Sequence, residues 1–349
     1  MENQKNNHHF VPQFYLKKFS NNKKSVGAYF LSNHKYVEHA SIKGIAYRKH
    51  LYGKDDDIEN ALAHDEGLWN KIIEKIIRTK QINLSEEDYL NLLIFITVTE
   101  ARTALTADYN NKEINAIYGL IYKLETGQNK TLDVEFKIPN LTPLKSALKI
   151  YPILFDLDII LIVNNSNRGF ITSDNPVVRY NQFFVFRRYF RNYGLGHMGI
   201  QIFFPLSPEV CICVYDRTMY KPEMDGIITV KSGSQINELN KLFLLNAYQT
   251  IFFSNHQKES YIRSLIKYRY SKYSFDIPVF GAGNHYLIQT SHPSVHDSIK
   301  LSFFSINPDL LDVSLPAHAA GPIRPYAEEF DKNKKRKRQH EETKESPNG

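Results

Sequence analysis

Cysteine is scarce in this sequence, because its 349 residues include only Cys211 and Cys213. One residue separates them, a spacing at which a disulfide would be strained, and no further cysteine completes a zinc site. We therefore expect two reduced core thiols in a cytoplasmic protein. Long apolar runs are also missing. The apolar stretches near residues 90–96 and 159–163 are too short to span a membrane, and the first residues do not resemble a signal peptide, so we predict no membrane contact.

The sequence also lacks the short motifs of several enzyme classes. It contains no Walker loop, no G-x-S-x-G elbow, no dinucleotide-binding fingerprint and no spacing of an established nuclease motif. Tryptophan occurs once, against 22 tyrosines and 22 phenylalanines. Aromatic residues in such number either fill a core or provide stacking platforms for bases.

The net charge is modest, at +7, and part of it is concentrated at the C-terminus. Residues 331–349 contain seven Lys or Arg and four Asp or Glu, which leaves about +4 for the rest of the chain. We predict that 331–349 is a disordered basic tail, solvated and weakly attracted to nucleic acid. A positive body is compatible with an anionic partner without requiring one.

The most specific stretch is the segment from His8 to Phe19. Pro12 suits the start of a short helix, which an apolar stripe would anchor on the core. Adjacent histidines on an extended segment point to opposite sides, so only one of His8 and His9 should face a site, and we choose His9. The alternative is that one imidazole packs or caps while the other is solvated.

The rest of the sequence predicts one α+β domain over residues 1–330, in which a helical block packs on a mainly antiparallel sheet. Apolar residues at helical spacing place the helical half at about 57–150, and short β-branched runs place the sheet half at about 151–330. Residues 26–38 are expected to form a β-hairpin, and residues 170–172 a strand that pairs with 158–163. A helix is expected from Ile236 to about Ile251, and a long apolar helix from Tyr89 to about Ala107. It contains Glu100 and Arg102, and a charged side chain in a buried pattern needs a partner or a ligand.

A second polar motif, Thr172-Ser173-Asp174-Asn175-Pro176, follows a predicted strand. Pro176 keeps Asn175 out of the helical conformation, so several short polar side chains share a small volume. The motif is either a plain Asx turn or a carboxylate fixed at a strand end, where metal ligands and general bases are found.

These motifs together resemble the uncharacterised DUF4238 family. The resemblance includes His8-His9-x-Val11-Pro12-Gln13-x-Tyr15-Leu16, Ile45-Ala46 with Leu51-Tyr52, Asp57-Ile58-Glu59, Glu66, Arg102-Thr103, Phe170 to Val177, Pro205 to Pro208, Asn240 and Asn246. It covers residues 8–255 in the order of the family. The sequence departs from it at Glu100, where glutamine is expected. The family carries no established reaction, but the resemblance implies that these scattered polar residues belong to one design.

From that set we predict a site with His9, Asp174 and Arg102 as catalytic residues. His9, Glu66 and Asp174 would hold Mg²⁺ or Mn²⁺, and Arg102 would stabilise a phosphate-centred transition state. Binding residues would be Gln13, Tyr15, Ser173, Asn175, Arg187 and Arg188, the last two among aromatic residues that would stack on nucleic acid.

Three functions remain open at this stage. The first is a metal-dependent nuclease or phosphodiesterase that acts on nucleic acid, with a role in host defence. The second is a non-catalytic sensor or binding protein for a small anionic ligand or nucleic acid. In the third, the polar residues form a buried network that fixes the helical half on the sheet half.

Overall fold

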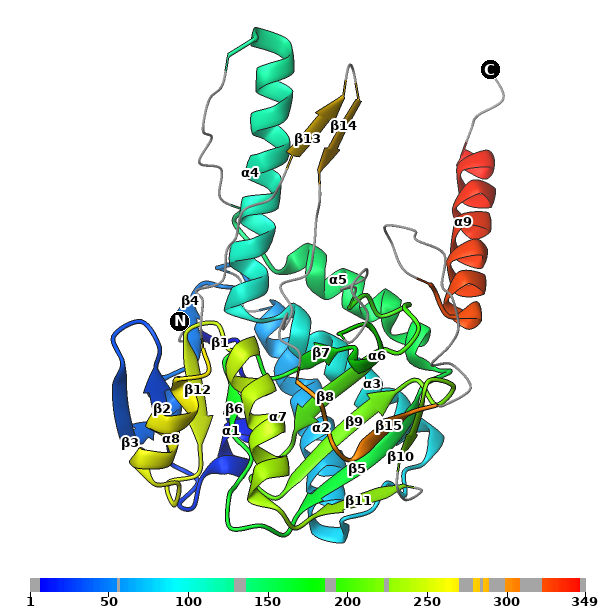
Figure 1. Cartoon of the computed structure of the whole chain (residues 1–349). Coiled ribbons are helices and arrows are strands. Elements are labelled where there is room, and N and C mark those ends of the chain that lie inside the picture. The colour runs from blue at the N-terminus through cyan, green and yellow to red at the C-terminus, as the bar shows by residue number, and fades with distance from the viewer. Residues whose placement is uncertain are drawn as a thin grey trace.

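The computed structural model describes residues 7–54, 57–128, 136–185, 193–222, 226–269, 279–282, 285–288, 299–307 and 322–345. Its architecture is α+β with mainly antiparallel sheets, as predicted (Figure 1). The described helices are α1 (Gln13–Leu16), α2 (Asp57–Thr79), α3 (Glu86–Ala101), α4 (Ala104–Thr126), α5 (Leu141–Ile150), α6 (Gln182–Val185), α7 (Gly233–Asn246), α8 (Glu259–Ile266) and α9 (Pro325–Glu345), with short 3-10 turns η1 (Lys17–Phe19), η2 (Ile42–Gly44) and η3 (Tyr151–Leu154).

The strands fall into two main sheets and three small pairs. The described strands are β1 (Asn7–His9), β2 (Ser25–Phe30), β3 (Lys35–Ser41), β4 (Tyr47–Lys49), β5 (Asp158–Asn164), β6 (Thr172–Ser173), β7 (Val178–Tyr180), β8 (Gln201–Pro205), β9 (Val210–Tyr215), β10 (Tyr220–Pro222), β11 (Ile227–Val230), β12 (Thr250–Phe253), β13 (Val279–Ala282), β14 (His285–Ile288) and β15 (Phe304–Ile306). The larger sheet has the order β11-β5-β9-β8-β7, and only its β11–β5 pair is parallel.

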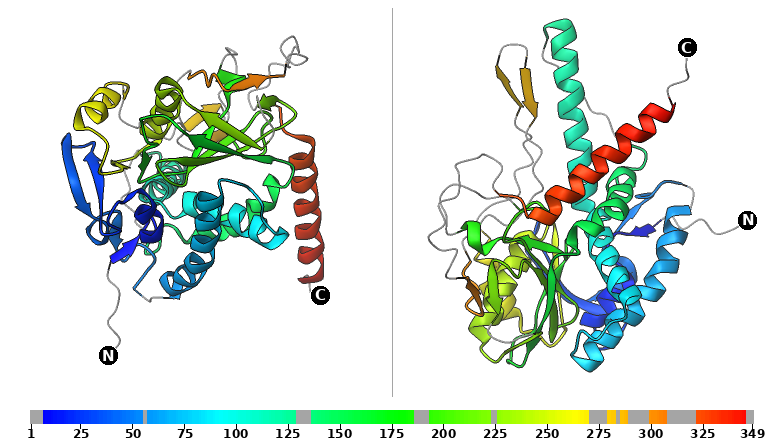
Figure 2. Two further views of the ribbon diagram at one scale, coloured as in Figure 1. Left: turned by 90° about the horizontal axis from the view of Figure 1, so that it is seen from below. Right: turned by 90° about the vertical axis from the view of Figure 1, so that its right-hand side faces the viewer.

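This larger sheet separates two hydrophobic cores. Side chains alternate along a strand, so Leu161 and Ile212 face α2 and α3, whereas Ile160 and Cys213 face α7. The views from below and from the side show these helices on opposite faces of the sheet (Figure 2). Both faces are therefore covered, which explains why β5 and β9 are apolar almost throughout. Cys211 and Cys213 are buried free thiols, as predicted.

The prediction of one long helix over residues 89–107 is wrong in one respect, because the structure has two helices there. α3 and α4 meet at a bend of 58° around Arg102 and Thr103. The Thr103 hydroxyl accepts a hydrogen bond from Thr106 N at 3.2 Å and so begins a new helix. The buried Asn140 side chain donates to the carbonyls of Ala101 and Thr103, at 2.8 and 3.1 Å, and satisfies backbone groups that the break leaves open. We call this bend the α3–α4 kink.

The smaller main sheet joins distant parts of the sequence. Its order is β3-β2-β12-β6, so the predicted β2–β3 hairpin is confirmed and pairs with β12. The segment 170–172 was expected to return as the partner of β5, but β6 pairs with β12 instead. The helix expected to reach residue 251 ends at Asn246, because the chain turns there into β12.

The C-terminal segment begins with an anchored helical turn, and the disorder expected from residue 331 stays a prediction. The chain is helical from Pro325 to Glu345. The first turn is anchored by Ala327, which is buried, and by Phe330, which packs against the core. The lysine, arginine, glutamate and glutamine residues that follow are good helix formers, so they can extend a helix from this anchored turn. In Figure 1 this helix, α9, points away from the sheets.

Among the described helices, only one pair comes near the length and hydropathy of a membrane-spanning segment. No single helix is long and apolar enough to cross a bilayer, and α3 and α4 meet the criteria only when joined across their bend.

Candidate functional site

The structure brings three of the predicted site residues together around Arg102. This side chain is 1% exposed and lies at the C-terminal end of α3. Its Nη1 donates to Glu66 Oε1 and its Nη2 to the carbonyl oxygen of His9, both at 2.7 Å. Its Nε donates to the hydroxyl of Tyr52 at 3.1 Å. Arg102 therefore ties the N-terminal strand to α2 and to the α3–α4 kink.

The two histidines of the opening segment have different surroundings. His8 is fully buried, its Nδ1 accepts from Tyr52 N at 3.0 Å, and its ring stacks on Tyr52 with centroids 5.4 Å apart. His9 is half-buried, and its Nδ1 lies 3.4 Å from Gln13 Nε2. Burial lowers the pKa of His9, while the backbone of Lys43 acts in the opposite direction. A neutral imidazole beside the Glu66 carboxylate could accept a proton.

Arg102 itself is badly placed for the predicted role of phosphate clamp. Its pKa is raised by the nearby Tyr52 and Glu66 although burial opposes this, so it stays charged. The guanidinium is already bonded to groups within the protein, and a phosphate group from solvent cannot reach a side chain that is 1% exposed. The role that the contacts support is structural.

Asp174 is also bonded to groups within the protein, in this case to backbone N–H groups. Its Oδ1 accepts from Tyr248 N at 2.8 Å, and its Oδ2 accepts from Gln249 N at 2.7 Å and Thr250 N at 3.0 Å. It thereby closes the turn between α7 and β12. Burial raises the pKa of Asp174 to about 6, against the effect of those three N–H groups and of Arg269. The Asx turn that we weighed from sequence is thus replaced by a long-range cap.

The neighbours of Asp174 reinforce the same turn. Ser173 Oγ accepts from Asn175 N at 3.1 Å and donates to the Asn175 carbonyl at 2.8 Å. Asn175 and Asn246 exchange side-chain bonds to each other's carbonyls, at 3.1 and 2.7 Å. Of the other predicted binding residues, Tyr15 is fully buried and donates to the Pro205 carbonyl at 2.6 Å. Arg187 and Arg188 lie outside the described residues.

The predicted metal set does not fit a metal centre. Within the described residues no hydrogen bond or ion pair joins Asp174 to His9, Glu66 or Arg102. The same part of the chain contains no group of three or more His, Cys, Asp or Glu side chains that could hold a metal ion. The reason is that Asp174 directs both carboxylate oxygens at backbone N–H groups, which use three of its roughly four acceptor sites.

Glu100, the other charged residue of α3, has a partner that the sequence did not reveal. Its carboxylate pairs with the guanidinium of Arg179 on β7, and the two side chains are 8% and 14% exposed. The pair lies on the wall of a pocket of about 390 Å³, which we call the kink pocket. Its lining residues come from α3 to α5, η3, β7 and one loop: Thr97, Glu100, Ala101, Thr106, Pro143, Ser146, Ala147, Ile150, Ile153, Arg179, Gly194, Leu195 and Gly196.

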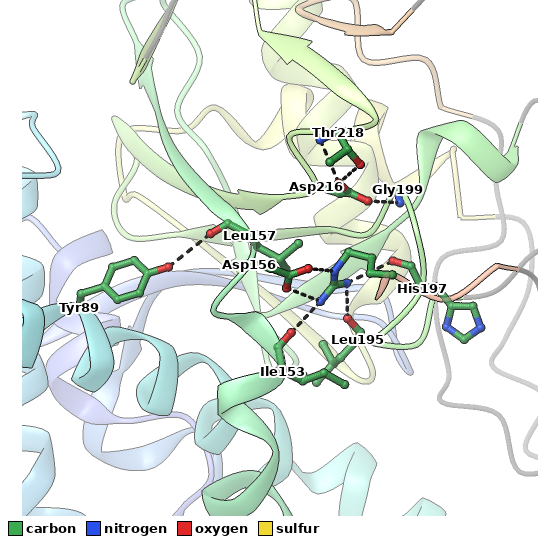
Figure 3. A network of polar contacts seen from close by, with 10 residues as sticks. Tyr89, Ile153, Asp156, Leu157, Leu195, His197, Gly199, Asp216 and Thr218 are labelled. Atoms are coloured by element: carbon green, nitrogen blue, oxygen red, sulfur yellow. Dashed lines mark hydrogen bonds and ion pairs between the residues drawn. The ribbon is translucent and has the colours of Figure 1, made fainter. Parts of the chain in front are cut away.

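A buried arginine fixes one wall of the kink pocket. Arg324 is 3% exposed and binds Asp156 through Nε at 2.8 Å and Nη2 at 3.0 Å. It also donates to the carbonyls of Ile153 and Leu195, both at 2.6 Å, and these two residues line the pocket. Figure 3 shows Asp156, Ile153, Leu195 and His197 converging on this point. The position of the wall therefore depends on a residue far along the chain.

Two other pockets among the described residues are larger than the kink pocket. One, of about 600 Å³, lies where α5 meets α9 and is lined by Lys149, Tyr326, Glu329, Phe330, Asn333 and Lys334. The other, of about 520 Å³, has cations that are engaged. Lys18 Nζ binds Glu74 at 2.5 Å. Arg168 donates to the Gly233 carbonyl at 3.2 Å and lies over the ring of Tyr261. The kink pocket is smaller, but its arginine keeps a free donor. Arg179 Nε is buried, and no group within the described residues accepts a hydrogen bond from it.

Fold and site together define an α+β protein with buried charged clusters on either side of a helix kink and a pocket beside one of them. Residues 7–257 match the family model described as "Protein of unknown function (DUF4238)", so the chain belongs to that family, as the motifs had indicated. The comparisons with curated proteins and with solved structures gave no match.

Sequence reasoning found Glu100 but missed Arg179, Asp156 and Arg324. A charged residue in an apolar helix predicts a partner without saying where in the sequence that partner lies. Arg179 is one arginine among several, and Arg324 stands beyond the matched part of the chain. The signal that could have found Arg179 is its place in Val177-Val178-Arg179-Tyr180, where a cation interrupts a buried strand.

Proposed function

We propose that this protein binds a small ligand carrying an anionic group in the kink pocket and does not act on it chemically. The observation that carries the proposal is the buried, unpaired Nε of Arg179, a residue that lines the pocket. Leaving a buried donor unsatisfied costs about 1–3 kcal/mol, and more for a charged group. An anionic group that accepted from this N–H would remove that cost and gain a charge-assisted hydrogen bond.

The lining of the pocket favours binding over catalysis. Its described residues include no histidine, cysteine or lysine, and its one carboxylate, Glu100, is paired with Arg179. Six lining side chains are aliphatic or proline, and such walls with a few placed polar groups are typical of ligand sites: Ala101, Pro143, Ala147, Ile150, Ile153 and Leu195. A volume of about 390 Å³ is at the small end of the range for ligand pockets, so the ligand is small.

The experiment is a binding screen on the purified full-length protein by isothermal titration calorimetry and thermal shift. The probes are small monocarboxylates, dicarboxylates, inorganic phosphate and free amino acids. We expect at least one probe to bind and Arg179→Lys to weaken it about tenfold or more, since lysine keeps the charge beside Glu100 but has no Nε–H in that position. Arg48→Lys, at an ion pair with Asp108, is the matched control and should leave binding unchanged.

Two outcomes would overturn the proposal. One is that no probe binds at millimolar concentration, although the protein is folded by circular dichroism. The other is that a probe binds equally well to wild type and Arg179→Lys, which would place the site elsewhere.

The nuclease function is a second candidate, and the cluster of His9, Glu66 and Arg102 is the observation that favours it. Here His9 would be the base, and a role in host defence would rest on this activity. The test is incubation with RNA and DNA, with Mg²⁺, Mn²⁺ or chelator. His9→Gln should abolish cleavage, and His256→Gln, at an exposed histidine, is the control. No cleavage by wild type under any of these conditions removes this candidate.

A further inference from the structure

The kink pocket carries two opposite charges, and this limits what can bind there. The Glu100 carboxylate lies beside the Arg179 guanidinium, and both side chains are largely shielded from water. No other charged residue is among the described lining residues, so the wall as a whole is neutral. A simple anion that approached Arg179 would also approach Glu100.

Like charges that share a poorly solvated site repel one another strongly. When two carboxylates share such a site, the pKa of one of them is strongly raised, so that carboxylate tends to be protonated. A ligand that bears a cationic group next to its anionic group avoids this conflict. Its anion accepts from Arg179 Nε while its cation approaches the Glu100 carboxylate, so each charge on the wall gains an opposite charge.

The remaining lining describes the body of the ligand. Ile150, Ile153, Pro143 and Leu195 form an aliphatic surface, and no aromatic residue is among the described lining residues. Bases and aromatic rings are usually held by stacking on aromatic side chains, so this wall gives a nucleotide no platform. An aliphatic side chain of a few carbons fits both the surface and the volume of about 390 Å³.

We propose that the ligand is a free aliphatic α-amino acid, whose carboxylate binds Arg179 and whose ammonium group binds Glu100. This rests on the proposed function, because it specifies the ligand of the same pocket. The two groups of an α-amino acid are attached to one carbon, which matches two wall charges that already contact each other.

The test compares ligands that differ by one group. Leucine, valine and alanine are titrated into the full-length protein beside their des-amino analogues, 4-methylpentanoate, 3-methylbutanoate and propanoate. We expect leucine or valine to bind at least tenfold more tightly than its des-amino analogue. Glu100→Gln should remove that difference, because the neutral amide no longer attracts ammonium, while the des-amino acid binds at least as well as before. Asp108→Asn, at the Arg48 ion pair outside the pocket, should keep the wild-type preference.

The outcomes separate the two proposals. If wild type binds the des-amino acids as tightly as the amino acids, the pocket takes a plain carboxylate, so the amino-acid assignment is wrong and the proposed binding function stands. If neither series binds, both proposals fail. If Glu100→Gln keeps the full preference for the amino acids, ammonium recognition lies elsewhere and the assignment of Glu100 is wrong. Circular dichroism on each variant checks that the fold is retained.

Discussion

Glu100 and Arg102 are two residues apart at the end of α3, yet they form ion pairs in different parts of the molecule. Glu100 pairs with Arg179 on the sheet, and Arg102 pairs with Glu66 on α2. Two residues on a helix are about 200° apart, so their side chains leave on nearly opposite sides. The α3–α4 kink therefore lies between two charged clusters, and it fixes the kink pocket and the N-terminal strand relative to each other.

Arg102→Met should destabilise the protein by about 3–5 kcal/mol. The change leaves a carboxylate and a backbone carbonyl without their donor, which is the usual cost of breaking a buried ion pair. Urea unfolding measures the loss. Arg217→Met is the control, since Arg217 is 69% exposed and lies 3.7 Å from Asp158, and it should cost at most about 1 kcal/mol. Equal losses in the two variants would contradict the central role of Arg102.

The α3–α4 kink should depend on Asn140. Asn140→Leu keeps the size of the side chain but removes the amide that donates to the carbonyls of Ala101 and Thr103. We expect a loss of about 1–3 kcal/mol in unfolding free energy. Hydrogen exchange should also speed up at the start of α4. Asn60→Leu, which replaces an exposed side chain on α2, should change neither quantity. Unchanged exchange at the kink in Asn140→Leu would count against this role.

The stability of the protein should fall as the pH rises from about 4 to about 6. Burial raises the pKa of Asp174 to about 6, above the ordinary value near 4. The folded chain thus holds a proton that the unfolded chain has already released, and ionising this group costs the folded state up to about 3 kcal/mol across that interval. Above about pH 6 the effect of this group is constant.

Comparison with Asp174→Asn isolates this effect from other titrating groups. The variant presents an NH₂ group to backbone N–H donors, so it should be less stable than wild type at low pH. The difference should shrink as the pH rises from about 4 to about 6 and then stay level, and a difference that is constant over the whole range would contradict the raised pKa. Urea unfolding at pH 4.5, 6 and 7.5 gives the three values needed.

Arg324 should contribute far more to the stability of the fold than the helix that follows it. Arg324→Met breaks the bond to Asp156 and frees the carbonyls of Ile153 and Leu195, with an expected loss of about 3–5 kcal/mol. Removal of residues 331–349 takes away mainly charged and polar residues, so the melting temperature should change little. Thermal unfolding of both variants checks this. A large drop on truncation would show that α9 docks beyond its first turns.

Much of the fold could be predicted from local patterns, and the failures share a cause. The α+β class, the β2–β3 hairpin and α2 follow from periodicity and turn residues. The break after Ala101 and the end of α7 at Asn246 do not, because they depend on Asn140 and Asp174, which reach these points from other parts of the sequence. Long-range hydrogen bonds of this kind leave no local signal.

The candidate site could likewise be predicted only in part from the sequence. The motifs contain His9, Glu66 and Arg102, and the structure brings these residues together. The same argument added Asp174, because a carboxylate after a strand can be a ligand, whereas here it is a cap. Residue type could not distinguish these roles, since both need an ionisable oxygen in a fixed position. The distinction lies in which donors surround it.

The pairing of β2 with β12 has a consequence for how the chain folds. Phe30 lies opposite Thr250, so one edge of the N-terminal hairpin has no partner until most of the chain has left the ribosome. Until then an exposed strand edge is available for wrong pairing, and contacts of such long sequence separation form slowly. A chain cut between the helical and sheet halves would leave the smaller sheet incomplete in both fragments. Early-terminated products of this gene are therefore expected to aggregate or to be degraded, and neither half is expected to fold alone.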